Sequence, residues 1–168
     1  MVVAQGNIVA NAEGARGEGL DLVEDPRATS YPLAAQSNDG SAAPNGIPGT
    51  VAVLELTEEL SLVQLSLDTD GATGADVSHP AHIHNNSASE GGGIEIYLSP
   101  IDGTDAAARS SKLVAEPYET LVDFDGYVNV HESVANLGAV VSQGNIGANA
   151  SGSSSGGDDG SSGGGGGY

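Results

Sequence analysis

The sequence predicts an all-β protein, folded as a Greek-key β-sandwich or barrel of about seven or eight strands. Three observations favour this class. Several short segments alternate apolar and polar residues, as strands with one buried face do. The 26 glycines and 7 prolines favour turns over long helices. Aromatic residues make up only 4% of the chain, so the core has to be built from Val, Leu, Ile and Ala.

Strand-like segments begin at Tyr31. In chain order they span residues 31–36, 50–56, 60–67, 82–84, 94–98, 127–131 and 139–146. The second and third are expected to pair as a hairpin, because only Thr57-Glu58-Glu59 separates them. Residues 133–138 are expected to form one short helical turn that ends at Gly138. The predicted core consists of Val51, Val53, Leu62, Ile83, Ile94, Ile96, Val128, Val130 and Val141.

The composition divides the chain into four parts. Residues 1–12 have the pattern of a strand, and residues 13–30 form a polar, glycine-containing linker or arm. Residues 31–150 hold the β-domain. Residues 151–168 are almost wholly Gly, Ser and Asp, which is the composition of a flexible linker.

An internal repeat relates the two ends of the chain. Val2-Val3-Ala4-Gln5-Gly6-Asn7-Ile8-Val9-Ala10-Asn11-Ala12 matches residues 140–150 at nine of eleven positions, and only Ala4/Ser142 and Val9/Gly147 differ. Two interpretations are open. In the first, the chain was cut from a tandem array and the N-terminal copy is the closing strand of a preceding unit. In the second, residues 2–10 are a donor strand that replaces a similar strand in a neighbouring molecule.

The protein is strongly acidic, with 23 Asp and Glu residues against 4 Lys and Arg and a net charge of -19. This charge repels phosphate backbones and anionic membranes, so no nucleic-acid partner is expected. The acidity leaves three explanations open: a solvated surface, divalent-cation binding, or life at high salt. No apolar run approaches the roughly 20 residues of a membrane-spanning helix, so no membrane span is predicted.

Cysteine is absent, so neither disulfides nor thiol chemistry are expected. Met1 is followed by Val2-Val3-Ala4-Gln5, without the basic and apolar regions of a signal peptide. Such a start is expected of a mature or trimmed form of an exported protein.

The four histidines are confined to two segments. Three lie in His79-Pro80-Ala81-His82-Ile83-His84, and the fourth is His131. Because side chains alternate along a strand, His82 and His84 face one side while Ile83 enters the core on the other. If the strand that ends at His131 runs beside the first one, its imidazole converges on this pair. An all-imidazole set without a thiolate favours copper(II) or zinc.

The histidines and the acidic segments also have interpretations that do not involve a metal. A His-x-His pair on a strand is also compatible with solvated or hydrogen-bonded rings. His79 is the weakest candidate ligand, because Pro80 separates it from the strand, and a turn cap is its alternative role. The Asp-Gly segments at residues 68–71, 102–105 and 123–126 favour turns over calcium, since none completes an EF-hand loop.

Residues 31–149 resemble CHRD domains, named after chordin, and in particular the bacterial exported type. The resemblance rests on Ser78-His79-Pro80-Ala81-His82-Ile83-His84, Gly92-Gly93-Ile94, Phe124-Asp125-Gly126-Tyr127-Val128-Asn129-Val130-His131 and Val141-Ser142-Gln143-Gly144-Asn145-Ile146-Gly147. It implies a β-sandwich, an extracellular or cell-envelope location and tandem occurrence. The tandem occurrence agrees with the repeated segment.

The histidine pattern is also similar to the copper half of Cu,Zn superoxide dismutases, which are Greek-key β-barrels. By that resemblance His82, His84 and His131 would be copper ligands. However, a bridging histidine, a recognisable zinc set and the disulfide cysteines are missing from the sequence, and no arginine follows His131 to guide superoxide. Dismutase activity is therefore not favoured. An immunoglobulin-like sandwich is the alternative fold.

Three functions are expected from these patterns. The first is a non-catalytic, exported structural protein, a subunit of an extracellular filament, matrix or surface assembly that self-associates into a homopolymer by exchanging residues 2–10. The second is a copper- or zinc-binding module of the cell envelope, with His82, His84, His131 and, as the weakest ligand, His79. The third and least favoured is a dismutase-like copper enzyme. The first two are compatible, because a metal can hold strands together.

Overall fold

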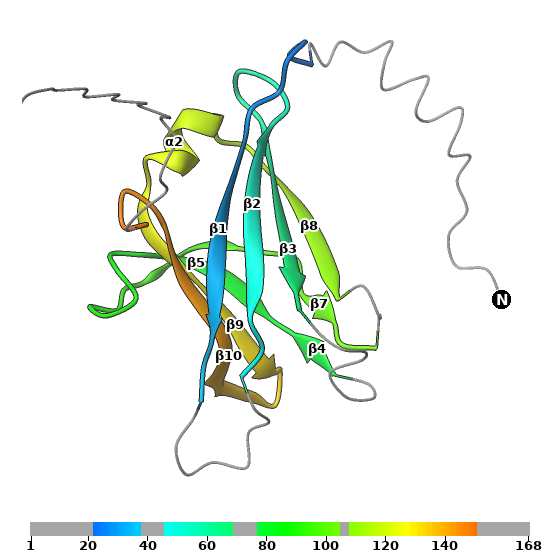
Figure 1. Ribbon diagram of the computed structural model, residues 1–168, viewed down its shortest axis with the longest axis vertical. Helices are drawn as coiled ribbons and strands as arrows, with labels where there is room; N and C mark the ends of the chain where they lie inside the picture. Colours follow the sequence, from blue (N-terminus) through cyan, green and yellow to red (C-terminus); the bar gives the residue numbers. More distant parts are fainter. Residues whose placement is uncertain (1–21, 38–45, 69–76, 105–107, 151–168) are drawn as a thin grey trace, which may run out of the picture.

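The structure is a computed structural model that describes residues 22–37, 46–68, 77–104 and 108–150 (Figure 1). These residues form strands and one short helix, which confirms the predicted all-β class. The elements are β1 (Ala28–Ala35), β2 (Gly49–Glu55), β3 (Ser61–Leu67), β4 (Ser78–His79), β5 (Ala81–Asn85), β6 (Ile94–Tyr97), β7 (Ile101–Asp102), β8 (Arg109–Val114), α2 (Tyr118–Val122), β9 (Asp125–Ser133) and β10 (Asn136–Gly147). The predicted donor strand and the Gly/Ser-rich tail lie outside the described residues.

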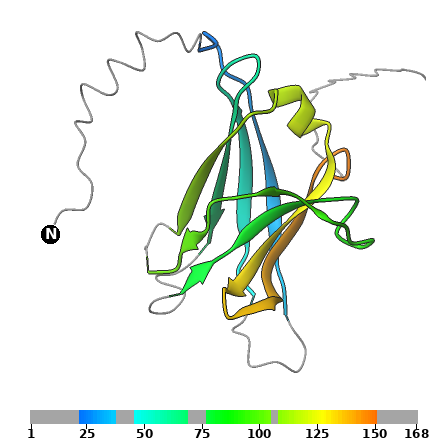
Figure 2. The same cartoon turned by 180° about the vertical axis from the view of Figure 1, so that it is seen from behind.

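Eight strands form one antiparallel sheet in the order β6-β5-β9-β10-β1-β2-β3-β8, and β4 pairs with β7. The sheet curls so that β1, β2, β3 and β8 lie across from β5, β9 and β10 (Figure 1). Seen from behind, β5, β9 and β10 come to the front (Figure 2). The neighbours β5 and β9, β10 and β1, and β3 and β8 are not consecutive in the chain, so its connections cross between the two halves.

Side-chain hydrogen bonds tie β8, an edge strand of the sheet, to the connection between β6 and β7. The Ser99 hydroxyl donates to the carbonyl of Ser111 at 2.9 Å, and the Ser110 hydroxyl donates to the carbonyl of Ser99 at 2.8 Å. Both Ser110 and Ser111 belong to β8. These bonds hold the edge of the curled sheet against the opposite half.

The core lies between the two halves and consists mainly of aliphatic side chains, together with Tyr31 and Tyr118. Six residues of the predicted core are buried, namely Val51, Val53, Ile83, Val128, Val130 and Val141. Other aliphatic residues outside the predicted core are also at most 1% exposed, among them Val63, Leu65, Ile101, Leu121 and Ile146.

The prediction that Leu62 enters the core is wrong. On β3 the inward side chains are Ser61, Val63, Leu65 and Leu67, and Leu62 is only partly buried on the opposite face. Both faces of this strand carry leucine. The face with three aliphatic residues turns inward, because it removes more apolar surface from water.

Two further residues of the predicted core belong to the edge strand β6, and neither is fully buried. Ile94 is 40% exposed, so its predicted burial is wrong. Ile96 is partly buried and packs against the core from its margin. β6 has only β5 as a neighbour in the sheet, and its ladder shifts register between Ile83 and His84. The strand therefore lacks the cover that a central strand receives.

The short helix predicted over residues 133–138 is also wrong. Residues 134 and 135 form the turn of a hairpin, in which Asn136 of β10 pairs with Ser133 of β9. The Ser133 hydroxyl accepts a hydrogen bond from the Asn136 backbone N–H at 3.1 Å. Gly138 lies inside β10 and does not end a helix.

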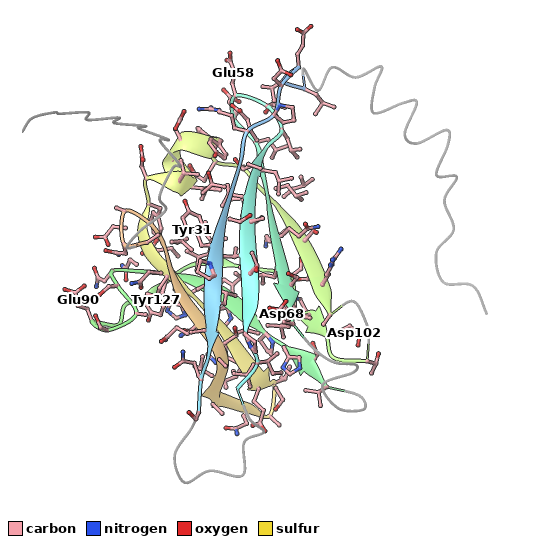
Figure 3. The ribbon with its side chains drawn as sticks, viewed as in Figure 1. Tyr31, Glu58, Asp68, Glu90, Asp102 and Tyr127 are labelled. Carbon is pink, nitrogen blue, oxygen red and sulfur yellow. The ribbon has the colours of Figure 1, made fainter. Side chains whose placement is uncertain are left out.

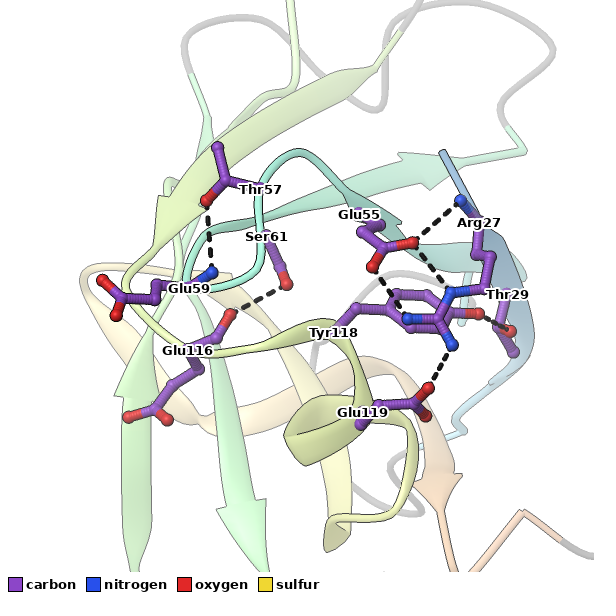
Figure 4. Close-up of polar contacts among 9 residues, drawn as sticks. All are labelled: Arg27, Thr29, Glu55, Thr57, Glu59, Ser61, Glu116, Tyr118 and Glu119. Carbon is purple, nitrogen blue, oxygen red and sulfur yellow. Dashed lines mark hydrogen bonds and ion pairs between the residues drawn. The ribbon is translucent and has the colours of Figure 1, made fainter. Parts of the chain in front are cut away.

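The single described helix, α2, is tied to the sheet by Arg27 (Figure 4). The Arg27 guanidinium donates to both carboxylate oxygens of Glu55, at 2.7 and 2.8 Å, and also to Glu119. It lies over the Tyr118 ring, 4.6 Å from the ring centroid, and the Tyr118 hydroxyl bonds to Thr29 at 2.5 Å. Within the described residues, no helix has the length and apolarity needed to span a membrane.

Candidate metal centre

β5 carries two histidines on one face. His82 and His84 lie on the outer face of the sheet, whereas Ile83 between them is 0% exposed in the core. This is the predicted alternation of a strand. Although the two histidines point away from the core, they are only 9% and 8% exposed, so the site is shielded from solvent.

β9 brings the third histidine to this face. It runs antiparallel beside β5, and Asn129 is the direct partner of His82. His131 follows Asn129 by two residues, so its side chain points the same way. The backbone N–H of His131 donates to the carbonyl of Pro80 at 2.8 Å, which extends the contact between the two strands.

The three rings form one cluster. The centroid of the His82 ring lies 5.1 Å from that of His131 and 5.9 Å from that of His84. One ligand atom from each of the three residues can be chosen so that all lie within 4.8 Å of one another. Bonds of about 2.0–2.1 Å in a tetrahedral site separate the ligand nitrogens by roughly 3.3 Å. The group therefore needs only small ring movements to close around an ion.

Each ring keeps one buried nitrogen without a hydrogen-bond partner: His82 Nδ1, His84 Nε2 and His131 Nδ1. Buried polar atoms in native proteins nearly always have a partner. Three buried nitrogens without partners in one cluster are unfavourable, unless something binds them. A metal ion bound by these nitrogens would satisfy all three at once.

Backbone groups orient two of these rings. The carbonyl of Gly92 lies 3.1 Å from His84 Nδ1, and the Leu137 backbone hydrogen-bonds to the His131 ring. Because a carbonyl only accepts, His84 carries its proton on Nδ1 and leaves the Nε2 lone pair free. Metal-bound histidines are typically held in this way, with the second nitrogen donating to a backbone carbonyl.

Two tyrosines line the cluster, and the sequence did not single them out. Tyr127 stacks on His84 with ring centroids 4.8 Å apart, and Tyr97 meets His82 edge-on at 5.0 Å. Figure 3 shows Tyr127 beside the loop that carries Glu90. Tyr127 is 5% exposed and Tyr97 is 63% exposed, so the cluster is closed on one side and more open on the other.

His79 lies outside this group of three. It belongs to β4, is 2% exposed, and its Nδ1 lies 3.0 Å from the backbone carbonyl of His131. This contact connects β4 to β9 across the break at Pro80. The structure thus gives His79 a hydrogen bond within the fold, outside the group of ligand atoms that the other three offer.

Burial lowers the pKa of both His82 and His131 below the ordinary histidine value. The neighbouring imidazoles His131 and His84 lower the pKa of His82 further, because a second positive charge nearby is repelled. The His82 and His131 rings are therefore neutral near pH 7, which is the form that binds a metal.

The metal-free protein is expected to lose stability as the pH falls below about 6.5. In the unfolded chain these histidines take up protons near that value, whereas in the folded protein His82 and His131 do so only at lower pH. The unfolded state then binds more protons, so the free energy of unfolding falls as the pH falls. Urea unfolding at pH 7, 6 and 5 measures this slope. The His82→Ala/His131→Ala variant should show a shallower slope, and an equal slope would attribute the loss to other groups.

The Asp-Gly segment that begins at Asp102 forms a turn in its described part. The turn predicted at residues 123–126 is wrong, because Asp123 ends α2, and Asp125 and Gly126 begin β9. Asp102 accepts hydrogen bonds from the Thr104 backbone N–H at 2.9 Å and from its hydroxyl at 2.7 Å. These bonds lower the pKa of the Asp102 carboxyl. They are those of an Asx turn, as the sequence predicts. Parts of the segments at residues 68–71 and 102–105 lie outside the described residues.

Comparisons of the chain with protein-family models, with curated proteins and with solved structures find no match. The fold and the site define the class of protein on their own. It is an all-β domain with a three-histidine cluster that could hold a metal ion.

Proposed function

We propose that this protein is a metal-binding module in which His82, His84 and His131 hold one copper or zinc ion. A single observation carries the proposal: the three residues offer ligand atoms within 4.8 Å of one another. The buried nitrogen without a partner in each ring agrees with it. The rings project from paired central strands, so the fold pre-organises the ligands and little ordering is needed on binding.

The chemistry of the ligands favours copper(II) or zinc. Imidazole nitrogens suit both ions, whereas calcium and magnesium take oxygen ligands, and the group contains no carboxylate. Three protein ligands leave a fourth coordination position for water or another molecule. The more open side of the cluster, next to Tyr97, is where such a ligand would enter.

Metal-free protein is expected to bind about one equivalent of copper(II) or zinc, measured by calorimetric titration and by elemental analysis after desalting. The His82→Ala/His84→Ala variant should bind none at this affinity. His79→Gln is the matched control, because it removes the histidine outside the cluster and should retain the full equivalent. An unchanged metal content in the double variant would eliminate the site.

We also propose a second, compatible function as an exported structural subunit that self-associates into an extracellular filament, matrix or surface assembly. The supporting observation is the repeat, since residues 2–12 carry nearly the same sequence as residues 140–150, which include the second half of β10. In β10 a strand of nearly this sequence pairs within the sheet. The resemblance to exported CHRD domains supports a location outside the cell.

Removal of residues 1–12 tests this second function. Negative-stain microscopy of the full chain is expected to show polymers, and the deletion should leave monomers of the same fold. Undiminished fibres in the deletion variant would reject strand donation by this segment. The comparison is made with and without a chelator, so that assembly through the metal is separated from assembly through the strand.

A further inference from the structure

The strand that the N-terminus repeats has a central place in the sheet. β10 lies between β9 and β1, and the eight-stranded sheet has its edges at β6 and β8. From Ser142 to Gly147 each residue of β10 pairs with a residue of β9, and on its other side Gln143 is paired with Ala34 of β1. A second copy of this sequence therefore finds its matching partners only in the place that β10 occupies.

We propose that residues 2–8 of one molecule replace residues 140–146 in the sheet of a second molecule. This inference rests on the self-assembly proposed above and specifies how it is achieved. Exchange of nearly identical strands costs little, because most contacts that are broken are made again. Since donor and acceptor surfaces differ, the exchange repeats from molecule to molecule without closing.

The repeat preserves the apolar residues with which β10 fills the core. Val141 and Ile146 are both 0% exposed. Their counterparts in the N-terminal segment are Val3 and Ile8. An exchanged segment would thus bury the same side chains at the same depth.

The repeat also preserves the polar contacts of β10. The Gln143 side-chain amide donates to the Asn129 side-chain oxygen at 2.8 Å, and the Asn145 side-chain oxygen accepts from the Ala88 backbone N–H at 2.8 Å. The counterparts in the N-terminal segment are Gln5 and Asn7.

A glycine between them is required by close packing. A Cβ atom on Gly144 would lie 2.3 Å from the carbonyl oxygen of Pro32 on β1, which no side chain tolerates. The N-terminal segment has Gly6 at this position. The N-terminal segment therefore keeps the glycine that the β10 position requires.

The first difference between the copies favours the N-terminal segment. Ser142 is 0% exposed, and its hydroxyl has no hydrogen-bond partner. Burial of an unpaired hydroxyl is unfavourable. Ala4 at the same position has no hydroxyl, so the N-terminal segment is the better occupant of this buried site.

The second difference determines where the replacement ends. Gly147 has φ +56°, and a Cβ there would lie 2.1 Å from the carbonyl oxygen of Phe124. Val9 cannot adopt this turn, because a β-branched residue is strained at positive φ. The replacement therefore ends at Ile8, and the donor segment is residues 2–8.

Cysteine trapping in the full chain tests this arrangement, because the natural sequence has no cysteine. A Gln5→Cys variant is mixed with an Ala34→Cys variant under mild oxidation. Ala34 is an exposed residue and the cross-strand partner of Gln143, whose place Gln5 would take. The control acceptor is Ser30→Cys, which is also exposed on β1 but lies four residues away, about 13 Å along the strand.

We expect the disulfide-linked heterodimer to form at least tenfold more with Ala34→Cys than with Ser30→Cys. An added Ser142→Ala in the acceptor should lower the yield several-fold, because it improves the resident strand.

Equal yields for the two acceptors, or no heterodimer, would overturn the inference. So would a purely monomeric disulfide in the Gln5→Cys/Ala34→Cys double variant, because it would show replacement within one chain. If fibres form but no cross-linked heterodimer is found, the proposed self-assembly stands and only the strand exchange is rejected. If neither fibres nor the heterodimer are found, the proposed self-assembly and the strand exchange are both rejected.

Discussion

Saturation with copper(II) or zinc is expected to stabilise the folded protein by about 4 kcal/mol when the free metal exceeds its dissociation constant about a thousandfold. For a domain of this size such a gain corresponds to a rise of roughly 10–20 °C in the thermal midpoint. The gain arises because the three imidazoles of His82, His84 and His131 come together only in the folded state. Thermal unfolding with and without metal, followed by circular dichroism, measures the shift.

Single-histidine variants provide the controls for this shift. His131→Ala should remove most of it, because two ligands on β5 bind far more weakly than three ligands from two strands. His79→Gln should keep the shift, although it lowers the midpoint of the metal-free protein. A metal-induced shift that is as large in His131→Ala as in the wild type would contradict the assignment of His131 as a ligand.

Leu65→Ala is expected to destabilise the protein by about 2–5 kcal/mol, in the range measured for fully buried leucines. Leu65 is 1% exposed between the two halves of the sheet, so its removal leaves a cavity among aliphatic neighbours. Chemical unfolding of the metal-free protein gives the value directly.

Leu62→Ala is the matched control on the same strand. Leu62 lies on the other face of β3 and is only partly buried, so the substitution should cost less than about 1 kcal/mol. Equal losses of stability for Leu62→Ala and Leu65→Ala would mean that both faces of β3 are equally covered. A larger loss for Leu62→Ala would reverse the direction in which the strand faces.

The site was predictable from the sequence as far as it depends on a single strand. The two-residue spacing of His82 and His84 places both on one face, and the structure confirms this. The contribution of His131 depends on β9 lying beside β5 in one particular register. From the sequence alone, this pairing could be given only as a condition for the site. Such pairing between distant segments is set by the whole fold, and no local pattern encodes it.

The surroundings of the site were missed for related reasons. Tyr127 lies four residues before His131 on the same strand, so its parity already places it on the histidine face. Its stacking on His84 follows from the pairing of β5 with β9. The Gly92 carbonyl that orients His84 belongs to the loop after β5, and such backbone contacts have no signature in side-chain patterns.

The errors in the fold occur where local patterns are ambiguous. β8, with the sequence Arg-Ser-Ser-Lys-Leu-Val, was not predicted, because an edge strand that buries little has little alternation to detect. Residues 133–138 suggested a helical turn because a glycine follows a short run of helix-compatible residues. In the structure the pairing of β9 with β10 overrides this preference, since the hairpin satisfies more backbone hydrogen bonds.

X-ray absorption spectroscopy of the protein loaded with one equivalent of copper(II) or zinc tests the central claim most directly. We expect a first shell that contains three imidazole nitrogens at about 2.0–2.1 Å, and one fewer in each of the single variants His82→Ala, His84→Ala and His131→Ala. A first shell made of oxygen ligands, or one that is unchanged in these variants, would show that the metal binds elsewhere and that the cluster does not hold it.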